Sequence, residues 1–348
     1  KQGEVQGSDV AAHTAGVLDI KTTILPDADA LFLTAIDRYG HELWRWTFPV
    51  NKLNQANEVL SPLSNKVTST ETENELTVKA KNHTFIFSKK DGQLKGVSVN
   101  NRKISFANGP RFIGARRADR SLDQFYNHDD EKAKEKDRTY SEFPDAAVFT
   151  KLDVKEDGGN LIVTANYKLG NLDKAQWTIN PNGEAVLDYT YNFSGVVDLM
   201  GICFDYPEDQ VISKRWLGAG PYRVWQNRIH GTQYDVWEND YNDPIPGETF
   251  TYPEFKGYFG SVSWMNIRTK EGTISLTNET PDAYIGVYQP RDGRDRLLYT
   301  LPESGISVLN VIPPVRNKVN STDLCGPSSQ PKWVNGPQSG RIIFRFME

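Results

Sequence analysis

Apolar and polar residues alternate along most of the chain, and this pattern predicts β-strands. The stretch 185–193, AVLDYTYNF, has an aliphatic or aromatic residue at every second position and mainly polar residues between them. Residues 160–168, NLIVTANYK, repeat the pattern. A period of two is that of a half-buried strand. Further strands are expected at 17–22, 30–37, 42–48, 75–80, 83–88, 147–154, 174–179, 261–267, 283–288 and 341–346.

Turn-forming residues separate these segments. Clusters rich in Gly, Asn and Asp lie at 89–93, 155–160 and 180–185, and Asn182-Gly183 in the last is typical of the centre of a two-residue hairpin loop. The chain has no long amphipathic helix and no alternation of strands with helices. We therefore predict an all-β fold, and the pattern argues against a (β/α)₈ barrel within this chain.

Two segments interrupt the strand pattern. The polar residues from 51 onward predict a linker, assigned to 51–65, between a leading segment at 1–50 and the main body at 66–348. Residues 119–142 are strongly charged and predict a solvated loop or a short surface helix. About three strands in the leading segment are too few for a two-sheet sandwich, so it resembles the truncated end of a domain.

Composition and motifs exclude several classes of protein and ligand. Of the 348 residues, 38% are hydrophobic and 11% aromatic, enough to build a core, and the net charge of −5 argues against nucleic acid as a partner. No apolar run is long enough to predict a membrane span. The distant Cys203 and Cys325 do not predict a disulfide scaffold, and no motif predicts a metal, nucleotide or other cofactor. The chain begins with Lys1, which indicates a removed leader or a longer parent and favours a periplasmic or extracellular location.

Residues 216–228, WLGAGPYRVWQNR, hold the most suggestive chemistry. A Gly-x-Gly-Pro turn leads into Tyr222, Arg223, Trp225 and Arg228. Aromatic rings and guanidinium groups stack on and hydrogen-bond to flat or sugar-like partners, but they also build well-packed rims. Trp225 and Arg228 are the best candidates for ligand contact, with packing as the alternative.

The same stretch resembles a motif of the family 2 β-galactosidases. It matches the Trp-x-Gly-x-Gly-Pro motif of their C-terminal domain and departs from it at residues 223–225, where the family has Glu-Asn-Tyr. YPEFKGYFG at 252–260 is similar to the family's Pro-x-Glu-x-Gly segment, and PRFIGARRADRS keeps Arg117 and Ala118 of an acidic loop. With the hairpins from residue 82 onward and the closing strands, the resemblance covers about 66–348.

The resemblance implies both a fold and a role. It implies a large β-supersandwich like that of galactose mutarotases, preceded by the remnant of an immunoglobulin-like β-sandwich. Family 2 enzymes are retaining glycosidases whose two catalytic carboxyls lie on a barrel. That barrel is absent here, so no catalytic residue is assigned and the chain alone is expected to be inactive. It would be an accessory domain partnered by the parent's barrel and by a carbohydrate, with contacts expected from Tyr222, Arg223, Trp225, Arg228, Trp237 and Glu254.

Two other functions remain open. The chain could be a non-catalytic carbohydrate-binding β-sandwich, or a mutarotase-like epimerase, which needs a histidine and a carboxylate in one cleft. His230 and Glu254 are the candidate pair for the epimerase, while His83 is expected to be a satisfied core or rim residue. The carboxylates Asp235, Glu238 and Asp240 could form a pair with one another or with Glu254. The favoured interpretation of 234–244, however, is a polar loop pinned by its aromatic residues.

Overall fold

The computed structural model describes residues 2–21, 23, 28–50, 66–117, 140–144, 146–240, 257–287, 302–314, 328 and 330–348. The chain forms two compact units, residues 1–58 and 59–348. The predicted all-β fold is confirmed, because the described part of the chain consists of strands, turns and one short 3₁₀ helix, η1 (Glu208–Gln210). The predicted strand at 17–22 is wrong over its described residues 17–21, which lie in no strand or helix.

The first unit contains a two-stranded antiparallel sheet of β1 (Ala30–Ile36) and β2 (Glu42–Pro49). The register places Leu33 opposite Trp46 and Ala35 opposite Trp44, so one face of this hairpin is wholly apolar. Trp44, Trp46 and Phe48 on that face are 43–51% exposed. An isolated two-stranded sheet is only marginally stable, and its origin in an immunoglobulin-like domain stays a prediction.

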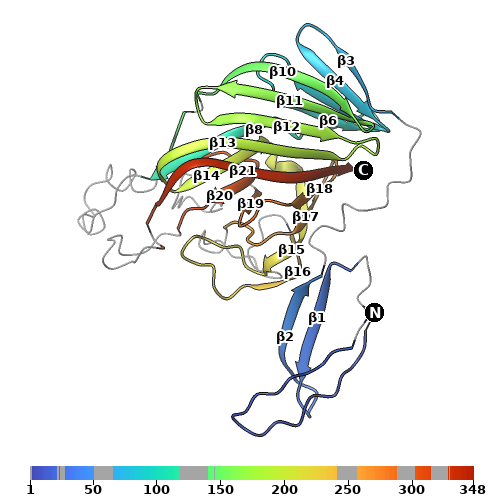
Figure 1. Ribbon diagram of the computed structural model, residues 1–348, viewed down its shortest axis with the longest axis vertical. Coiled ribbons are helices and arrows are strands. Elements are labelled where there is room, and N and C mark those ends of the chain that lie inside the picture. The colour runs from blue at the N-terminus through green and yellow to red at the C-terminus, as the bar shows by residue number, and fades with distance from the viewer. Residues whose placement is uncertain are drawn as a thin grey trace, which may run out of the picture. The chain divides into compact units, whose positions relative to one another are not determined.

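The second unit is built from two large sheets (Figure 1). The nine-stranded sheet has the order β10 (Val148–Asp157), β11 (Asn160–Lys168), β12 (Leu172–Ile179), β13 (Ala185–Val197), β21 (Lys332–Met347), β18 (Gly272–Asn278), β17 (Trp264–Thr269), β15 (Val211–Gly220) and β16 (Gln233–Asp240). All its neighbouring pairs are antiparallel. β21, from the C-terminal end of the chain, therefore lies between β13 and β18 and joins the two halves of the sheet.

The other sheet has ten strands. Its main path is β19 (Tyr284–Val287), β20 (Ile306–Val311), β14 (Leu199–Asp205), β8 (Ala107–Arg117), β6 (Leu94–Val99), β5 (His83–Ser88), β4 (Glu75–Ala80) and β3 (Thr68–Glu71), while β7 (Arg102–Ile104) pairs with β6 and β9 (Tyr140–Glu142) pairs with β8. β9 corrects the end of the charged segment, which was expected to be a loop or helix. The rest of that segment, like the linker at 51–65, lies outside the described residues.

The core lies between the two sheets and is rich in aromatic rings. Phe106 and Phe204, beside or on the ten-stranded sheet, stack at 4.6 Å between ring centroids, and Phe344 of β21 approaches them to 5.2 and 5.6 Å. Trp177 of β12 lies 6.2 Å from Phe87 of β5. Rings from opposite sheets thus interlock, as the alternation of the sequence requires for a two-layer sandwich.

The hairpin predicted at residues 180–185 joins β12 to β13. Asn180 and Glu184 close the loop, with the Asn180 N–H donating to the Glu184 carbonyl at 3.0 Å. The loop therefore contains three residues, Pro181, Asn182 and Gly183, rather than the predicted two. Gly183 has a φ of +88°, as expected where a turn in such a loop ends on a left-handed residue.

Candidate functional site

Residues 216–228 run from the end of β15 into two consecutive turns. The Ala219 N–H donates to the Gly260 carbonyl at 2.9 Å. Val224 and Tyr258 then exchange two backbone hydrogen bonds, at 2.7 and 2.9 Å, and the Arg228 N–H donates to the Trp225 carbonyl at 2.9 Å. The stretch is therefore fixed along its length against the segment that begins at Gly257.

Glycines allow these two segments to approach closely. A Cβ atom added at Gly257 would lie 2.2 Å from the Val224 carbonyl oxygen, and one at Gly218 would lie 3.0 Å from that of Gly260. The two segments that carry the sequence motifs therefore meet backbone to backbone. Because a side chain at Gly257 would push them apart, this glycine has a packing role.

Trp225 and Arg223, two of the residues expected to contact a ligand, are buried, and packing was the alternative left open for Trp225. Trp225 is 1% exposed and meets Tyr258 edge-on at 5.7 Å between ring centroids. Arg223 is 4% exposed, with its guanidinium 5.8 Å from the Phe259 ring centroid. Both are covered by a segment about thirty residues downstream, so the structure places Trp225 in its packing role.

Three other predicted residues lie at or near the surface. Tyr222 is 43% exposed, Arg228 is exposed and Trp237 is half-buried. The Trp237 indole donates its Nε1–H to the Gln233 carbonyl at 3.1 Å. A Cβ atom at Gly220 would lie 2.4 Å from this indole, so the ring lies directly against the backbone that leads to Tyr222. We call Tyr222, Arg228 and Trp237 the edge cluster. Trp237 lies on β16, the last strand of its sheet, and Tyr222 and Arg228 lie in the connection from β15 to β16.

The structure separates Asp235 from the other two described carboxylates of the candidate catalytic pairs. Glu254 lies outside them, so its meeting with His230, which is exposed, stays a prediction. The segment expected to be a polar loop is strand β16 up to residue 240. Successive strand residues point to opposite faces, so Asp235 lies on one face while Glu238 and Asp240 lie on the other.

His83 is a core residue, as expected from its place at the start of a strand. It is 9% exposed, and its Nε2–H donates to the Phe346 carbonyl at 2.8 Å. Its Nδ1 atom is buried without a hydrogen-bond partner among the described residues. Burial lowers the pKa of His83 below its usual 6.5, against a smaller opposing effect of the bond to Phe346.

We expect His83 to make stability depend on pH. Its pKa is lower in the folded chain than in the unfolded chain. The contribution of His83 to the free energy of unfolding is therefore full above about pH 6.5 and is lost as the pH falls further. The urea midpoint of the wild type should therefore fall between pH 7.5 and pH 5.5 by more than that of His83→Gln. An equal fall in both proteins would exclude His83 as the source.

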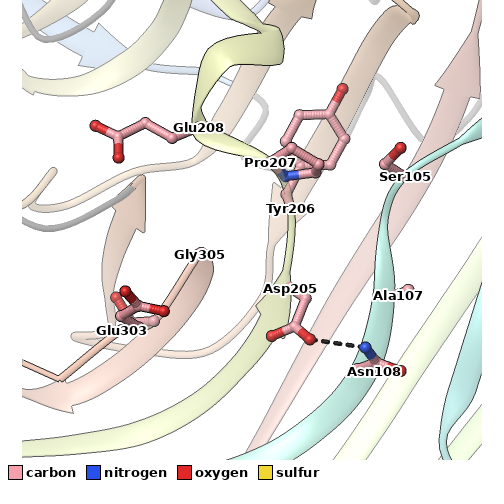
Figure 2. Close-up of a pocket in the computed structure, with 10 residues that line it drawn as sticks. Ser105, Ala107, Asn108, Asp205, Tyr206, Pro207, Glu208, Glu303 and Gly305 are labelled. Atoms are coloured by element: carbon pink, nitrogen blue, oxygen red, sulfur yellow. Dashed lines mark hydrogen bonds between the residues drawn. The ribbon is translucent and has the colours of Figure 1, made fainter.

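A separate polar pocket of about 410 Å³ opens on the ten-stranded sheet (Figure 2). It lies where β8 begins, where β14 ends and where residues 303–305 lead into β20. Its lining includes Asn108, Asp205, Glu208, Glu303 and Ser304. None of the residues predicted to bind a ligand lines it.

Two hydrogen-bond networks hold the walls of this pocket. Asp205 receives hydrogen bonds from Asn108 at 2.7 Å and from Arg111 at 2.8 Å. Burial acts to raise the pKa of Asp205, but these bonds outweigh it and keep the pKa below the usual value. On the same two segments, Glu271 accepts from the Ser105 hydroxyl at 2.7 Å and from the Tyr206 hydroxyl at 2.9 Å.

The sequence carried only a weak signal for this pocket. Asp205 and Glu208 flank Tyr206-Pro207 directly after an apolar strand, and polar residues at a strand end often mark a site. Glu303 and Asn108 come from segments about 100 residues away on either side, and only the sheet pairing brings the three segments together. Among the described residues, no group of three His, Cys, Asp or Glu side chains could hold a metal ion.

Comparisons with known proteins identify a family that the sequence matches and solved structures that the fold resembles. The family model described as the β-galactosidase small chain matches residues 79–312. A galactose 1-epimerase from Lactobacillus acidophilus is similar in structure, with 10% identity, a TM-score of 0.45, and coverage of 82% of this chain and 99% of that one. A homologue of the aldose epimerases from C. elegans has 8% identity and a TM-score of 0.36, covering 81% of this chain and 99% of its own. No curated protein matches the sequence.

Among the described residues, no helix is long and apolar enough to cross a membrane.

Proposed function

The chain belongs to the β-galactosidase small chain family, and from this premise we propose that it is a carbohydrate-facing accessory domain of a larger family 2 β-galactosidase-like enzyme. In this proposal the catalytic carboxylates belong to a barrel elsewhere in the parent protein. The present chain contributes a wall of the sugar site and contacts the leaving-group sugar.

The edge cluster is the observation that carries this proposal. Tyr222 is 43% exposed and follows a turn whose backbone lies against the Trp237 ring. Arg228 is exposed directly after a turn closed by hydrogen bonds between Trp225 and Arg228. Trp225, buried against Tyr258, is not one of the contact residues in this proposal.

The chemistry of the edge cluster suits a sugar ring. Tyrosine and tryptophan offer apolar faces for the C–H face of a pyranose, and arginine offers several N–H donors to its hydroxyls. Because the surrounding backbone is fixed by hydrogen bonds and glycine contacts, little conformational entropy is lost when a ligand binds. Glu254 would add an acceptor, which is part of the proposal.

Binding of lactose to the full chain tests this function. We expect Tyr222→Ala to weaken lactose binding about five- to tenfold in calorimetric titration, the loss of about 1–1.4 kcal/mol that one aromatic contact represents. The matched control is Tyr39→Ala, which removes a tyrosine that is 69% exposed in the other unit. Equal affinities in Tyr222→Ala and the wild type, or an equal loss in the control, would contradict the proposal.

A further inference from the structure

We propose that the polar pocket on the ten-stranded sheet is a second, independent carbohydrate site that binds a neutral saccharide through its hydroxyl groups. This inference goes beyond the accessory role and rests on different residues. Its volume of about 410 Å³ lies within the range of small-molecule sites.

Acceptor oxygens of three carboxylates, Asp205, Glu208 and Glu303, line the pocket. Figure 2 shows Asp205 and Glu303 on opposite walls, with the Asp205 carboxylate bound to Asn108. Each Asp205 oxygen receives one bond, from Arg111 or from Asn108, which leaves further lone pairs free to accept. These two bonds also fix the orientation of the carboxylate, so that it presents the lone pairs in a set direction.

Ser304 adds a further polar group to the lining. The residue is only 5% exposed, and its oxygen is not among the fully buried unpaired polar atoms of the described residues. The hydroxyl is therefore reachable from the open side of the pocket. A bound hydroxyl group would both accept from Ser304 and donate to the neighbouring carboxylates.

The charges in the pocket select among ligands. Asp205, Glu208 and Glu303 disfavour anionic ligands such as phosphates and acidic sugars. Arg111 is paired with Asp205 at 2.8 Å and compensates one of the three charges, so a cation is the competing ligand. A neutral polyol can donate to the carboxylates through its hydroxyls, which also accept.

The walls of the pocket are formed before a ligand binds. A Cβ atom at Gly305 would lie 2.2 Å from the Phe204 carbonyl oxygen, so the segment that carries Glu303 and Ser304 lies tightly against the end of β14. Ser105 and Tyr206 of the lining are both tied to Glu271. A preformed site loses little entropy on binding.

The pocket is distant from the edge cluster. Glu208 precedes β15 and Tyr222 follows it, and the ten residues of this strand span roughly 30 Å. One monosaccharide cannot contact both places, so the two sites can be tested separately.

Site-resolved NMR of the full chain, with galactose as the probe, tests the pocket. We expect the amide resonance of Gly305 to shift and saturate with galactose. Glu303→Gln should weaken this response about tenfold, whereas the exposed Glu75→Gln on β4 and Tyr222→Ala should leave it unchanged. Ser304→Ala should also weaken it and, like Glu303→Gln, should keep the wild-type melting temperature.

Other outcomes overturn the pocket site. A shift at Tyr222 without one at Gly305 would leave only the edge cluster as a sugar site. If Gly305 responds to spermidine or sulfate but not to galactose, the pocket binds a charged ligand. An unchanged response in Glu303→Gln would show that the carboxylate makes no contact.

Discussion

Trp225→Ala should destabilise the second unit by about 3–5 kcal/mol, the usual cost of removing a fully buried tryptophan. The ring is 1% exposed and packs in a cluster with Ile113, Leu199 and Leu309. Its removal leaves a cavity that a backbone fixed on both sides cannot fill by collapsing. Denaturant unfolding of the full chain measures the loss.

The matched control for this result is Tyr222→Ala, three residues earlier. Because Tyr222 is 43% exposed, its removal should change the free energy of unfolding by at most about 0.5 kcal/mol. The two variants therefore separate a packing role from a contact role within one turn. If both had the same small effect on stability, Trp225 would not belong to the core.

Gly183→Ala should destabilise the second unit by about 2–5 kcal/mol, for two reasons that add. A φ of +88° is unfavourable for alanine by about 1–2 kcal/mol. The new methyl group would also lie 2.0 Å from His83 Nδ1, and such overpacking costs a further 1–3 kcal/mol. Thermal or denaturant unfolding measures the sum.

Gly158→Ala separates the two contributions. Gly158 also has a positive φ, of +59°, but a Cβ atom there would meet nothing within 4 Å. Gly158→Ala should therefore lower the free energy of unfolding by only about 1–2 kcal/mol. Equal losses at both positions would mean that His83 moves aside freely when residue 183 gains a side chain.

Local patterns in the sequence were sufficient to predict most strands. The alternation at 160–168 and 185–193 gives β11 and the first part of β13, and the turn residues between strands give the hairpins. The length of a loop was predicted less accurately. Asn182-Gly183 suggested a two-residue loop, but the hydrogen bond from Asn180 to Glu184 closes a loop of three residues. Residues 17–21 have strand-like composition but pair with no strand.

The site was harder to predict because it depends on distant segments. Trp225 and Tyr222 have the same aromatic character, and only distant segments, the chain at 257–259 among them, bury the first and not the second. The polar pocket was missed for the same reason. Asn108, Asp205 and Glu303 are separated by about 100 residues each. They come together only because β8, β14 and β20 are neighbours in the sheet.

The central place of β21 has a consequence during synthesis. β13 pairs with it over thirteen residues, but roughly 150 residues separate the end of one strand from the end of the other. At about 5–20 residues per second, the ribosome needs roughly 8–30 s to cover that interval. Throughout it, the growing chain exposes a long unpaired strand edge, which is a template for pairing with other chains. Nascent chains of this protein should therefore aggregate unless a chaperone covers β13 until residues 332–347 emerge.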